Sequence, residues 1–527
     1  MATPQPTPAE ETDQVERPVA SPDVLIVGAG FSGIGIAIRM LAEGLTDFLM
    51  LERADDVGGT WRENTYPGCA CDIPSRVYSL SFAQNPDWST AYPRQREIWD
   101  HMRATVDRFG VRPYLRLGHE MQSARWDDSA GRWLVRTNAG LFTSRVLITG
   151  TGLLTEPSIP DLPGLGSFEG KVFHTANWDA DHRLEGERVA MIGTGASGVQ
   201  VVPEIQPRVE RLSVFQRTAP WIMPRYDRRV SATEKWIYRR FPVIQRIHRA
   251  LHYWLLESRG FPFFVEPRTF PLIERIALRH LRKQVPDPEL RARLTPDYTM
   301  GCKRILGSST YYPALQAENS ELITEAISEI TAGSIRTADG SEREVDTIIF
   351  GTGFEVVDWP LGRVIEGRDG VLLNDAWGGT PEGYKGTTTT GFPNMFMLVG
   401  PNVGLGHNSV LFMIESQISY VLDALRQMSE RRLQSVEVRA EEQRRFNERL
   451  QSKFTNTVWT SGCQSWYMNE EGRVHVLWPM STVRFRLELA RFDLAAYRAT
   501  PSQTMPGGGN EPPRPSDPAA LPATIGG

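Results

Sequence analysis

The 527-residue sequence contains few cysteines and few lysines, and these shortages exclude several classes of protein. Four cysteines are too few for a disulfide framework, and Cys69 and Cys71 are separated by one residue, which suits neither zinc nor a CxxC redox pair. We therefore expect a reduced chain in the cytoplasm. Only six of the 58 basic residues are lysines, no run of five like charges occurs, and the net charge is −5. This pattern offers no basic surface for nucleic acid.

The sequence also lacks a segment that predicts stable insertion into a membrane. Its longest apolar run, residues 24–41, contains four glycines, a serine and Arg39, and therefore indicates a buried strand, a turn and a helix. Residues 1–20 are polar, so we expect no signal peptide there. This segment and the Pro- and Gly-rich residues 501–527 are predicted to be disordered tails.

A glycine-rich turn near the start of the chain predicts the first nucleotide site. The apolar residues 23–27 lead into Gly28, Gly30 and Gly33, and a stretch at helical spacing follows. Such glycines permit a tight bend and close approach to a pyrophosphate, which the helix N-terminus binds. Glu52 lies 24 residues after Gly28, at the distance where an acidic residue binds ribose hydroxyls. This order of features predicts an FAD site.

A second turn of the same spacing begins at Gly193. The strand-like residues 188–192 precede it, and Arg217 occupies the position, 24 residues after Gly193, that Glu52 holds in the first unit. An acid there suits a free ribose, whereas an arginine suits a 2′-phosphate. The second site is therefore predicted to bind NADP(H). The two units together predict an α/β fold with two nested Rossmann-like dinucleotide-binding domains and a mainly helical insertion.

The order of the motifs gives the expected domain boundaries. They are residues 22–158 and 388–500 for the FAD-binding domain, 159–223 and 324–387 for the NADP-binding domain, and 224–323 for the helical insertion. A long helix is predicted from about Ser409 to Glu430, and its N-terminus suits the electron-rich end of a flavin.

The insertion has two interpretations. Apolar residues recur at helical spacing at Trp236, Ile237, Phe241, Ile244, Ile247, Leu251 and Leu255. This pattern predicts an amphipathic helix, which we expect to pack on the protein as a lid. The alternative is a helix that lies on a membrane surface, which the basic residues Arg239, Arg240, Arg246 and Arg249 would suit. Arg249 stands between His248 and His252 where an HExxH motif requires glutamate, so no metal site is predicted.

Residues 58–72 contain a further candidate cofactor element. Gly59, Thr60 and Trp61 are followed by turn residues, Tyr66 and an isolated aspartate, Asp72. A surface turn would account for the Pro-Gly pair at positions 67–68. Because a surface turn does not require two aromatic residues and an aspartate, we interpret the segment as a cofactor loop.

One stretch joins the two nucleotide units and carries a resemblance to a known family. Its pattern is Phe168-x-Gly170-x3-His174-x3-Trp178-Asp179, and the second glycine turn follows 14 residues after its end. With the two turns on either side, it resembles the fingerprint of the Baeyer–Villiger monooxygenases, flavin-dependent enzymes with two Rossmann-type units. The resemblance extends over about residues 23–491.

The resemblance implies cofactor contacts at individual positions. FAD would be lined by Gly28, Gly30, Ser32, Gly33, Glu52, Gly59, Thr60, Trp61, Asp72 and Tyr78. NADP would be held by Thr194, Gly195, Ala196, Ser197, Gly198, Gln200, Arg217, Thr218 and Lys303.

The resemblance also implies the catalytic residues. Arg304 resembles the family's active-site arginine beside the cofactors, and Asp72 resembles its carboxylate partner. Trp466 resembles the tryptophan of a loop that closes over the nicotinamide, although residues 468–472 depart from the family's Gly-Ala-Asn-like continuation. His174 resembles a residue that couples domain motion to catalysis.

The implied reaction converts a ketone into an ester or lactone. NADPH reduces FAD, dioxygen adds at the flavin C4a position, and the deprotonated C4a-peroxyflavin attacks the carbonyl. A guanidinium suits this chemistry because it stays charged and donates hydrogen bonds from a planar fork. The expected partners are a small-molecule ketone and O2, and the oligomeric state is left open.

Alternatives exist for the single residues and for the function. The structural interpretations are a simple ion pair for Asp72 and Arg304, a core histidine for His174 and a surface lysine for Lys303. Three other functions are alternatives to ketone oxidation: N- or S-oxygenation, the activity of a pyridine-nucleotide disulfide reductase, and a flavin redox sensor without turnover. The cysteine spacing disfavours the reductase. The Lys303-Arg304 pair and the Trp178-Asp179 ending favour oxidation of a ketone.

Overall fold

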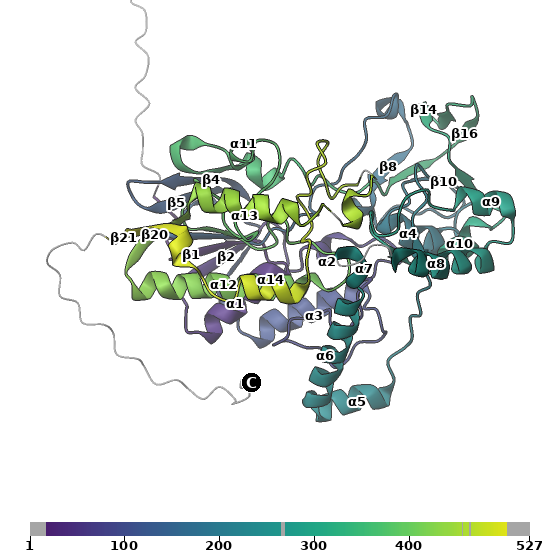
Figure 1. Cartoon of the computed structure of the whole chain (residues 1–527). Coiled ribbons are helices and arrows are strands. Elements are labelled where there is room, and N and C mark those ends of the chain that lie inside the picture. Colours follow the sequence, from purple (N-terminus) through teal and green to yellow (C-terminus); the bar gives the residue numbers. More distant parts are fainter. Residues whose placement is uncertain (1–16, 265–268, 456, 463–464, 503–527) are drawn as a thin grey trace, which may run out of the picture.

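The computed structural model describes residues 17–264, 269–455, 457–462 and 465–502 (Figure 1). Most of both predicted tails, residues 1–16 and 503–527, therefore lies outside the described residues. The end of the predicted N-terminal tail is attached to the protein, because the backbone N–H of Val19 donates to the carbonyl oxygen of Leu141 at 2.7 Å.

The first parallel sheet corresponds to the predicted FAD-binding domain. Its strand order is β19–β7–β1–β2–β3. The strands are β1 (Val24–Val27), β2 (Phe48–Glu52), β3 (Leu115–Leu117), β7 (Val146–Thr149) and β19 (Met395–Met397). Alternate residues of β1 belong to two separate apolar cores, one on each face of the sheet. Short strands that are apolar throughout are expected where both faces of a parallel sheet are covered.

Helices cover one face of this sheet and a second, smaller sheet covers the other. The helices of this unit are α1 (Phe31–Ala42), α2 (Thr60–Glu63), α3 (Gln95–Arg108), α12 (Val410–Glu430), α13 (Ala440–Ser452) and α14 (Thr482–Glu488). Two further strands of the unit are β20 (Leu433–Val438) and β21 (Tyr497–Pro501). The smaller sheet contains β4 (Met121–Asp127), β5 (Arg132–Thr137), β6 (Gly140–Ser144) and β18 (Ile365–Glu366). Helix α12, with Ser409 as its N-cap residue, confirms the long helix predicted from about Ser409 to Glu430.

The second parallel sheet repeats the plan with the order β13–β10–β9–β17–β8. Its strands are β8 (Lys171–His174), β9 (Arg188–Ile192), β10 (Arg211–Phe215), β13 (Ser320–Ile323) and β17 (Thr347–Phe350). The elements around it are α4 (Ala196–Ile205), α10 (Tyr311–Leu315), β14 (Ile327–Ile330), β15 (Ser334–Thr337) and β16 (Glu342–Glu344).

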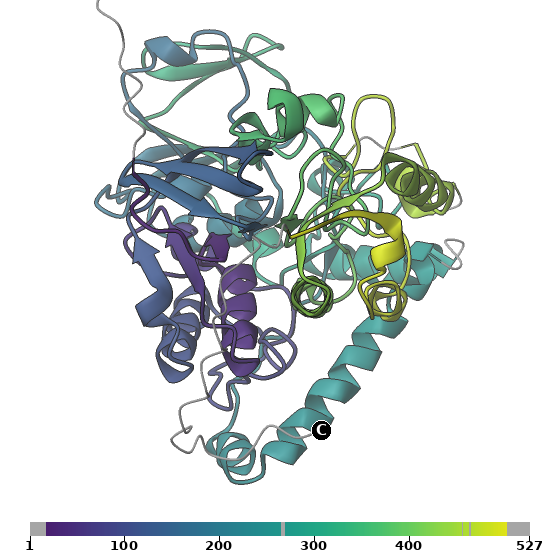
Figure 2. The ribbon, with the colours of Figure 1, turned by 90° about the vertical axis from the view of Figure 1, so that its left-hand side faces the viewer.

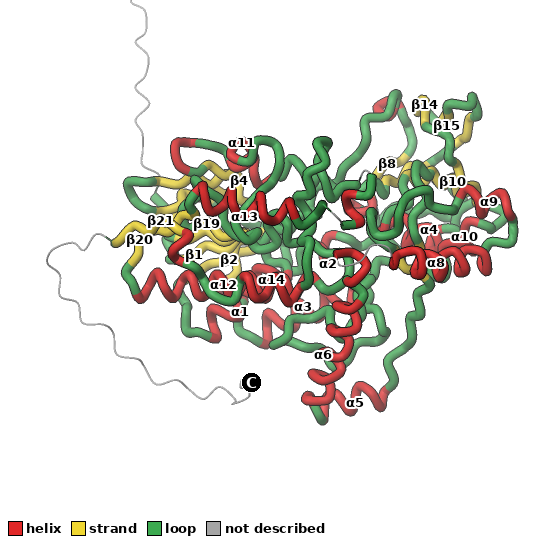
Figure 3. The backbone as a smooth tube through the Cα atoms, in the orientation of Figure 1, coloured by secondary structure: helices red, strands yellow, loops and turns green. Residues whose placement is uncertain are grey.

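The segment between the two halves of the second unit is mainly helical (Figure 3). It contains β11 (Ile222–Met223), α5 (Ala232–Arg240), α6 (Pro242–Ser258), α7 (Phe261–Phe264), α8 (Phe270–Gln284), α9 (Pro288–Arg293) and β12 (Leu306–Gly307). The remaining short helices are α11 (Leu373–Ala376), η1 (Arg112–Tyr114), η2 (Leu165–Ser167), η3 (Thr175–Asn177), η5 (Pro360–Arg363), η6 (Arg368–Gly370), η7 (Val458–Thr460) and η8 (Leu494–Ala496).

Two strands differ from the predicted domain ranges. β13 joins the second parallel sheet, although its residues were assigned to the helical insertion. β18 pairs with β4 of the first unit, although its residues were assigned to the NADP-binding domain. In both cases, hydrogen bonding to a strand distant in sequence determines the membership.

The predicted lid helix is two helices, and its expected packing is wrong. Pro242 begins α6 after Phe241 breaks the helical pattern, since proline is tolerated at a first helical position. The apolar residues Trp236, Ile247, Leu251 and Leu255 are exposed, whereas Arg249 is buried. Polar contacts rather than the apolar stripe therefore hold these helices on the protein.

Two further observations concern membrane crossing and the oxidation state of the cysteines. Within the described ranges, no helix has the length and apolar character needed to cross a membrane. Cys69 and Cys71 are free and buried. Cys302 takes part in a disulfide bond, so the expectation of a fully reduced chain is wrong for this residue.

Candidate active site

The first glycine turn joins β1 to α1 and leaves room for a nucleotide. A Cβ at Gly33 would lie 1.9 Å from the carbonyl oxygen of Gly28, so only glycine allows this approach of helix and strand. A Cβ at Gly30 would meet nothing closer than 3.9 Å, where its neighbour is Gly59. Ser32 is buried in the first turn of α1, whose N-cap residue is Gly30 and which has no side-chain cap. The N–H groups of this turn suit a pyrophosphate.

Glu52 ends β2 beside the same turn. Its carboxylate accepts hydrogen bonds from the backbone N–H groups of Ala29 at 2.7 Å and Ala54 at 3.0 Å. The predicted acidic residue therefore borders the glycine turn, where the ribose of a dinucleotide lies in this fold.

Residues 59–78 form the wall next to this turn. Thr60 and Trp61 begin α2, and Gly59 adopts a φ of 51°. The indole N–H of Trp61 donates to the hydroxyl of Tyr78 at 2.9 Å, and both side chains are buried. The structure thus brings Trp61 and Tyr78, two of the predicted FAD residues, into contact.

Asp72 and Arg304, which are 232 residues apart in the chain, form a bidentate ion pair. Nε of Arg304 donates to one carboxylate oxygen at 2.8 Å, and Nη2 donates to both oxygens at 2.8 and 2.6 Å. The negative charge of Asp72 raises the pKa of Arg304, so the guanidinium stays charged. Arg304 precedes β12, and among the described residues its Nη1 makes no hydrogen bond.

Tyr467 lies beside this pair and was identified from the sequence only as one member of an aromatic cluster. Burial raises its pKa to about 12, while the charge of Arg304 lowers it. Its neighbour Trp466 is 41 % exposed and lies 4.5 Å from the Tyr467 ring between centroids. Tyr467 is therefore the buried aromatic residue of this segment that lies within electrostatic range of the arginine. The position of Tyr467 after Trp466 was the only sequence signal for it.

The second glycine turn repeats the geometry of the first. A Cβ at Gly198 would lie 2.3 Å from the carbonyl oxygen of Gly193, and one at Gly195 would meet nothing closer than 3.9 Å. Ala196 and Ser197 begin α4, which has no side-chain cap. The hydroxyl of Thr194 donates to the carbonyl oxygen of Thr218 at 3.3 Å, which closes the turn against the end of β10.

Arg217 and Lys303 lie close to each other near this turn. Burial lowers the pKa of Lys303, and the positive charge of Arg217 lowers it further. The Lys303 ammonium lies 4.9 Å from the ring centre of Tyr298. Two neighbouring cations repel each other, so a bound 2′-phosphate would relieve the repulsion and accept charge-assisted hydrogen bonds.

Gln200 connects the two nucleotide units. Its side-chain oxygen accepts hydrogen bonds from the Tyr66 hydroxyl at 3.1 Å and the Ala70 N–H at 3.3 Å, and its amide donates to the Ala70 carbonyl oxygen at 3.0 Å. This NADP-domain residue therefore holds the FAD-domain loop that leads to Asp72. Tyr66 was noted only as part of that loop, since no sequence pattern indicates its partner.

The fingerprint stretch crosses from the first unit into β8. A Cβ at Gly170 would lie 2.3 Å from the Asp346 carbonyl oxygen, and Phe168 packs against the core of the second unit. His174 is buried at the end of β8, and its Nδ1 accepts from the Ala176 N–H at 3.1 Å. Burial lowers the pKa of His174 to about 4, so the ring is neutral. These contacts give the fingerprint a structural role.

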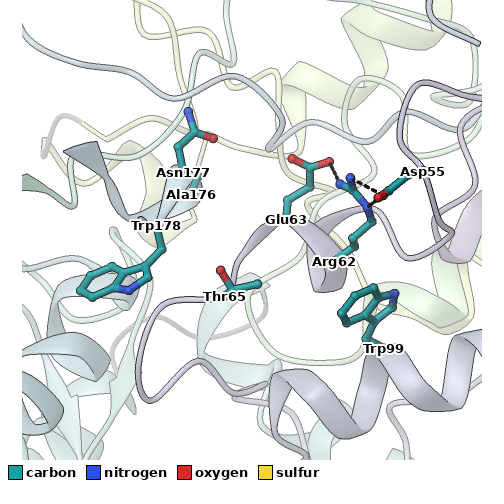
Figure 4. Close-up of a pocket in the computed structure, with 8 residues that line it drawn as sticks. All are labelled: Asp55, Arg62, Glu63, Thr65, Trp99, Ala176, Asn177 and Trp178. Carbon is teal, nitrogen blue, oxygen red and sulfur yellow. Dashed lines mark hydrogen bonds and ion pairs between the residues drawn. The ribbon is translucent and has the colours of Figure 1, made fainter. Parts of the chain in front are cut away.

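The end of the fingerprint borders a cleft of about 390 Å³ between the two units (Figure 4). Trp178 lies on one side and Arg62 and Trp99 on the other. Asp179 forms an ion pair with Lys171 at 2.6 Å and accepts from two backbone N–H groups that follow it. Asp179 therefore shapes the turn after Trp178.

Among the described residues, no cluster of His, Cys, Asp and Glu could hold a metal ion.

The fold and the two dinucleotide turns define a class of protein, the flavoproteins with two Rossmann-type units, and comparisons with known proteins agree with this class. Residues 21–272 match the family model of flavin-binding monooxygenase-like proteins. The chain is 51 % identical over 481 residues to a Baeyer–Villiger monooxygenase of Pseudomonas aeruginosa, a match that covers 90 % of this chain and 91 % of the relative. It is 46 % identical to one of Streptomyces coelicolor, covering 94 % and 95 %.

Solved structures of the same class superimpose over most of the chain. Cyclohexanone monooxygenase in a closed form gives a TM-score of 0.80 at 29 % identity and covers 92 % of this chain and 100 % of the other. The OTEMO complex with FAD and NADP gives a TM-score of 0.82 at 26 % identity, with 91 % and 100 % covered. The chain belongs to the Baeyer–Villiger monooxygenase family. The predictions of fold class, family and enzyme class are therefore confirmed, and the cofactors of these relatives match the predicted FAD and NADP(H).

Proposed function

We propose that this chain catalyses the NADPH- and O2-dependent insertion of an oxygen atom next to a ketone carbonyl, which yields an ester or a lactone. The observation that carries the proposal is the bidentate pair of Arg304 and Asp72. The pair holds the positive charge of Arg304 in a fixed position. Arg304 precedes β12, and Asp72 belongs to the loop of the first unit. Membership of the family supports the same reaction.

The residues of the first unit fit FAD. The facing glycines Gly30 and Gly59 form a cradle that a side chain would fill, and the uncapped start of α1 supplies N–H groups for the pyrophosphate. Glu52 would hold the ribose, and Trp61 and Tyr78 would form the wall of the site. Bound FAD, once reduced by NADPH, would activate O2 and deliver one of its oxygen atoms.

Arg304 would stabilise the negative charge that develops on oxygen during attack on the ketone carbonyl. Asp72 occupies Nε and Nη2 and so fixes the plane of the guanidinium, while Nη1 is left to donate toward the reacting atoms. A donor that is already oriented needs no reorganisation during the reaction, which is why such groups contribute strongly to rate. The buried Tyr467 lies within electrostatic range of the arginine and would help to limit the access of water to it.

Arg217 and Lys303 would bind the 2′-phosphate of NADPH, with Thr194, Thr218 and the start of α4 around the pyrophosphate. The mutual repulsion of the two cations supports this assignment. Charge-assisted hydrogen bonds are worth roughly 1.5–3 kcal/mol each. The enzyme is therefore expected to prefer NADPH over NADH by at least about tenfold. We place the reaction in the cytoplasm, with a small-molecule ketone and O2 as the partners.

The test is product analysis with the purified, FAD-loaded enzyme. Linear, cyclic, aromatic and polycyclic ketones and one thioether are incubated with NADPH and air, and the products are identified by mass. An ester or lactone that carries one added oxygen atom is expected from at least one ketone. Oxidation of the thioether alone would instead indicate S-oxygenation, and NADPH consumption without any oxygenated product would contradict both.

A further inference from the structure

Helices α5 and α6, here called the arm, present an apolar face to solvent. On α6 the exposed apolar side chains are Val243, Ile247, Leu251, Trp254 and Leu255, and Trp236 of α5 and Phe241 of the joint are exposed as well. The spacing on α6 follows i, i+4, i+8 and i+11, which is one stripe of a helix. A contiguous exposed apolar surface of this kind marks an interaction site.

The opposite face of α6 fixes the direction of the stripe. The Gln245 side chain donates to the Asn85 carbonyl oxygen at 2.8 Å, and the Arg249 guanidinium lies 4.9 Å from the ring centre of Phe412 on α12. At the end of α6, Glu257 accepts hydrogen bonds from the N–H and hydroxyl of Thr482 at 2.7 and 2.8 Å. The polar side of the helix is thus directed inward, so the apolar side remains available to a partner.

The surroundings of the stripe are positively charged. Arg240, Arg246 and Arg259 are exposed, and none of them forms an ion pair with another described residue. Residues 232–284 contain eleven Lys and Arg against four Asp and Glu, while the whole chain has a net charge of −5. A partner of the arm must therefore combine an apolar interior with negative charge at its surface.

We propose that the arm docks this enzyme on an anionic lipid surface, with α6 lying in the plane of the membrane interface. Helices that bind in this way carry basic residues beside a face of Trp, Phe and Leu, and tryptophan favours the headgroup region. Figures 1 and 2 both show the arm at the periphery, away from the two sheets, where a flat surface can reach it. The arm contains no proposed catalytic or cofactor residue, so this inference is independent of the proposed function.

A second copy of the chain is a less suitable occupant. A symmetric dimer brings the same patch of both subunits together. Here that contact would bring the basic residues beside the stripe of both subunits, Arg240 and Arg246 among them, close together, and like charges repel. Anionic headgroups neutralise these arginines instead.

The experiment measures binding of the full-length, FAD-loaded enzyme to sedimenting vesicles. Vesicles of phosphatidylcholine alone are compared with vesicles that also contain phosphatidylglycerol, at low and high salt. We expect binding to the anionic vesicles, with weakening at high salt. Leu251→Glu should lower the partition coefficient by about tenfold or more, since it replaces an exposed leucine that the membrane would bury. Arg246→Glu should lower it by about fivefold or more on anionic vesicles only.

The matched control is Leu487→Glu on α14, because Leu487 is 64 % exposed and Leu251 is 62 % exposed. This control should bind vesicles as the wild type does, and all variants should retain FAD and thermal stability. Absence of wild-type binding to the anionic vesicles would overturn the proposal, as would equal binding by Leu251→Glu and wild type. Sedimentation velocity that shows a wild-type dimer and a Leu251→Glu monomer, without vesicle binding, would assign the arm to a second copy instead.

Discussion

Replacing Arg304 by alanine tests the central step of the proposed reaction. The substitution removes a guanidinium that Asp72 holds by three hydrogen bonds of 2.6–2.8 Å. Loss of one preorganised donor to a developing oxyanion typically lowers kcat by about 10²–10³, or about 3–4 kcal/mol. We expect a decrease of that size in ketone oxygenation. Reduction of FAD by NADPH is a hydride transfer that precedes attack on the ketone and forms no oxyanion from it, so its rate should change far less.

Stopped-flow spectroscopy separates these two steps. Flavin reduction is followed without oxygen, and product formed per NADPH consumed is then measured in air. Arg304→Lys keeps the charge but loses the planar fork, so its rate should lie between those of the wild type and Arg304→Ala. The matched control is Arg145→Ala, which removes a bidentate pair with Asp23 of 2.7 and 2.6 Å at the opposite end of the first sheet. An Arg304→Ala enzyme that is folded, FAD-loaded and nearly as fast as the wild type with a ketone would refute the assignment.

Three further predictions concern the cofactors and the fold. Arg217→Ala and Lys303→Ala should each raise the KM for NADPH by about tenfold to a hundredfold with little effect on that for NADH, and an equal rise for both coenzymes would contradict the 2′-phosphate site. Gly33→Ala should reduce the flavin content of the purified protein, because the new Cβ would lie 1.9 Å from the Gly28 carbonyl oxygen, whereas Gly166→Ala, with nothing within 4 Å, should leave it unchanged. Burial lowers the pKa of His174 from 6.5 to about 4. As the pH falls through this range, the unfolded chain binds the proton first, so the stability that is fully present above pH 6.5 should decline by about 3 kcal/mol towards pH 4. His174→Gln should therefore flatten the dependence of Tm on pH over this window, and an unchanged slope would show that His174 does not contribute.

Both nucleotide sites were predictable because their determinants are local. The strand, the three glycines and the helix of each turn are consecutive in the chain, and each third glycine is required by a contact with the first. The hairpin of β4 and β5 is also local, and Trp126 pairs there with Trp133. Such features depend on spacing, which a sequence displays directly.

The active-site pair was predictable only through a resemblance. Spacing alone leaves Asp72 and Arg304 as two ordinary charged residues 232 positions apart, and only the packing of the insertion against the FAD-domain loop joins them. Tyr467 beside Arg304 and Gln200 beside Tyr66 are decided in the same way.

The sequence by itself determined two glycine turns between a strand and a helix and an amphipathic pattern in residues 236–255, and it predicts a ribose at the first turn and a 2′-phosphate at the second. Tertiary structure decided which side of that pattern faces the protein, and the result was opposite to the expectation. Helical periodicity shows that two faces differ, but it does not show which one is covered. Here, the hydrogen bond that Gln245 donates to Asn85 and the one that Glu257 accepts from Thr482 orient α6 and leave its apolar stripe exposed.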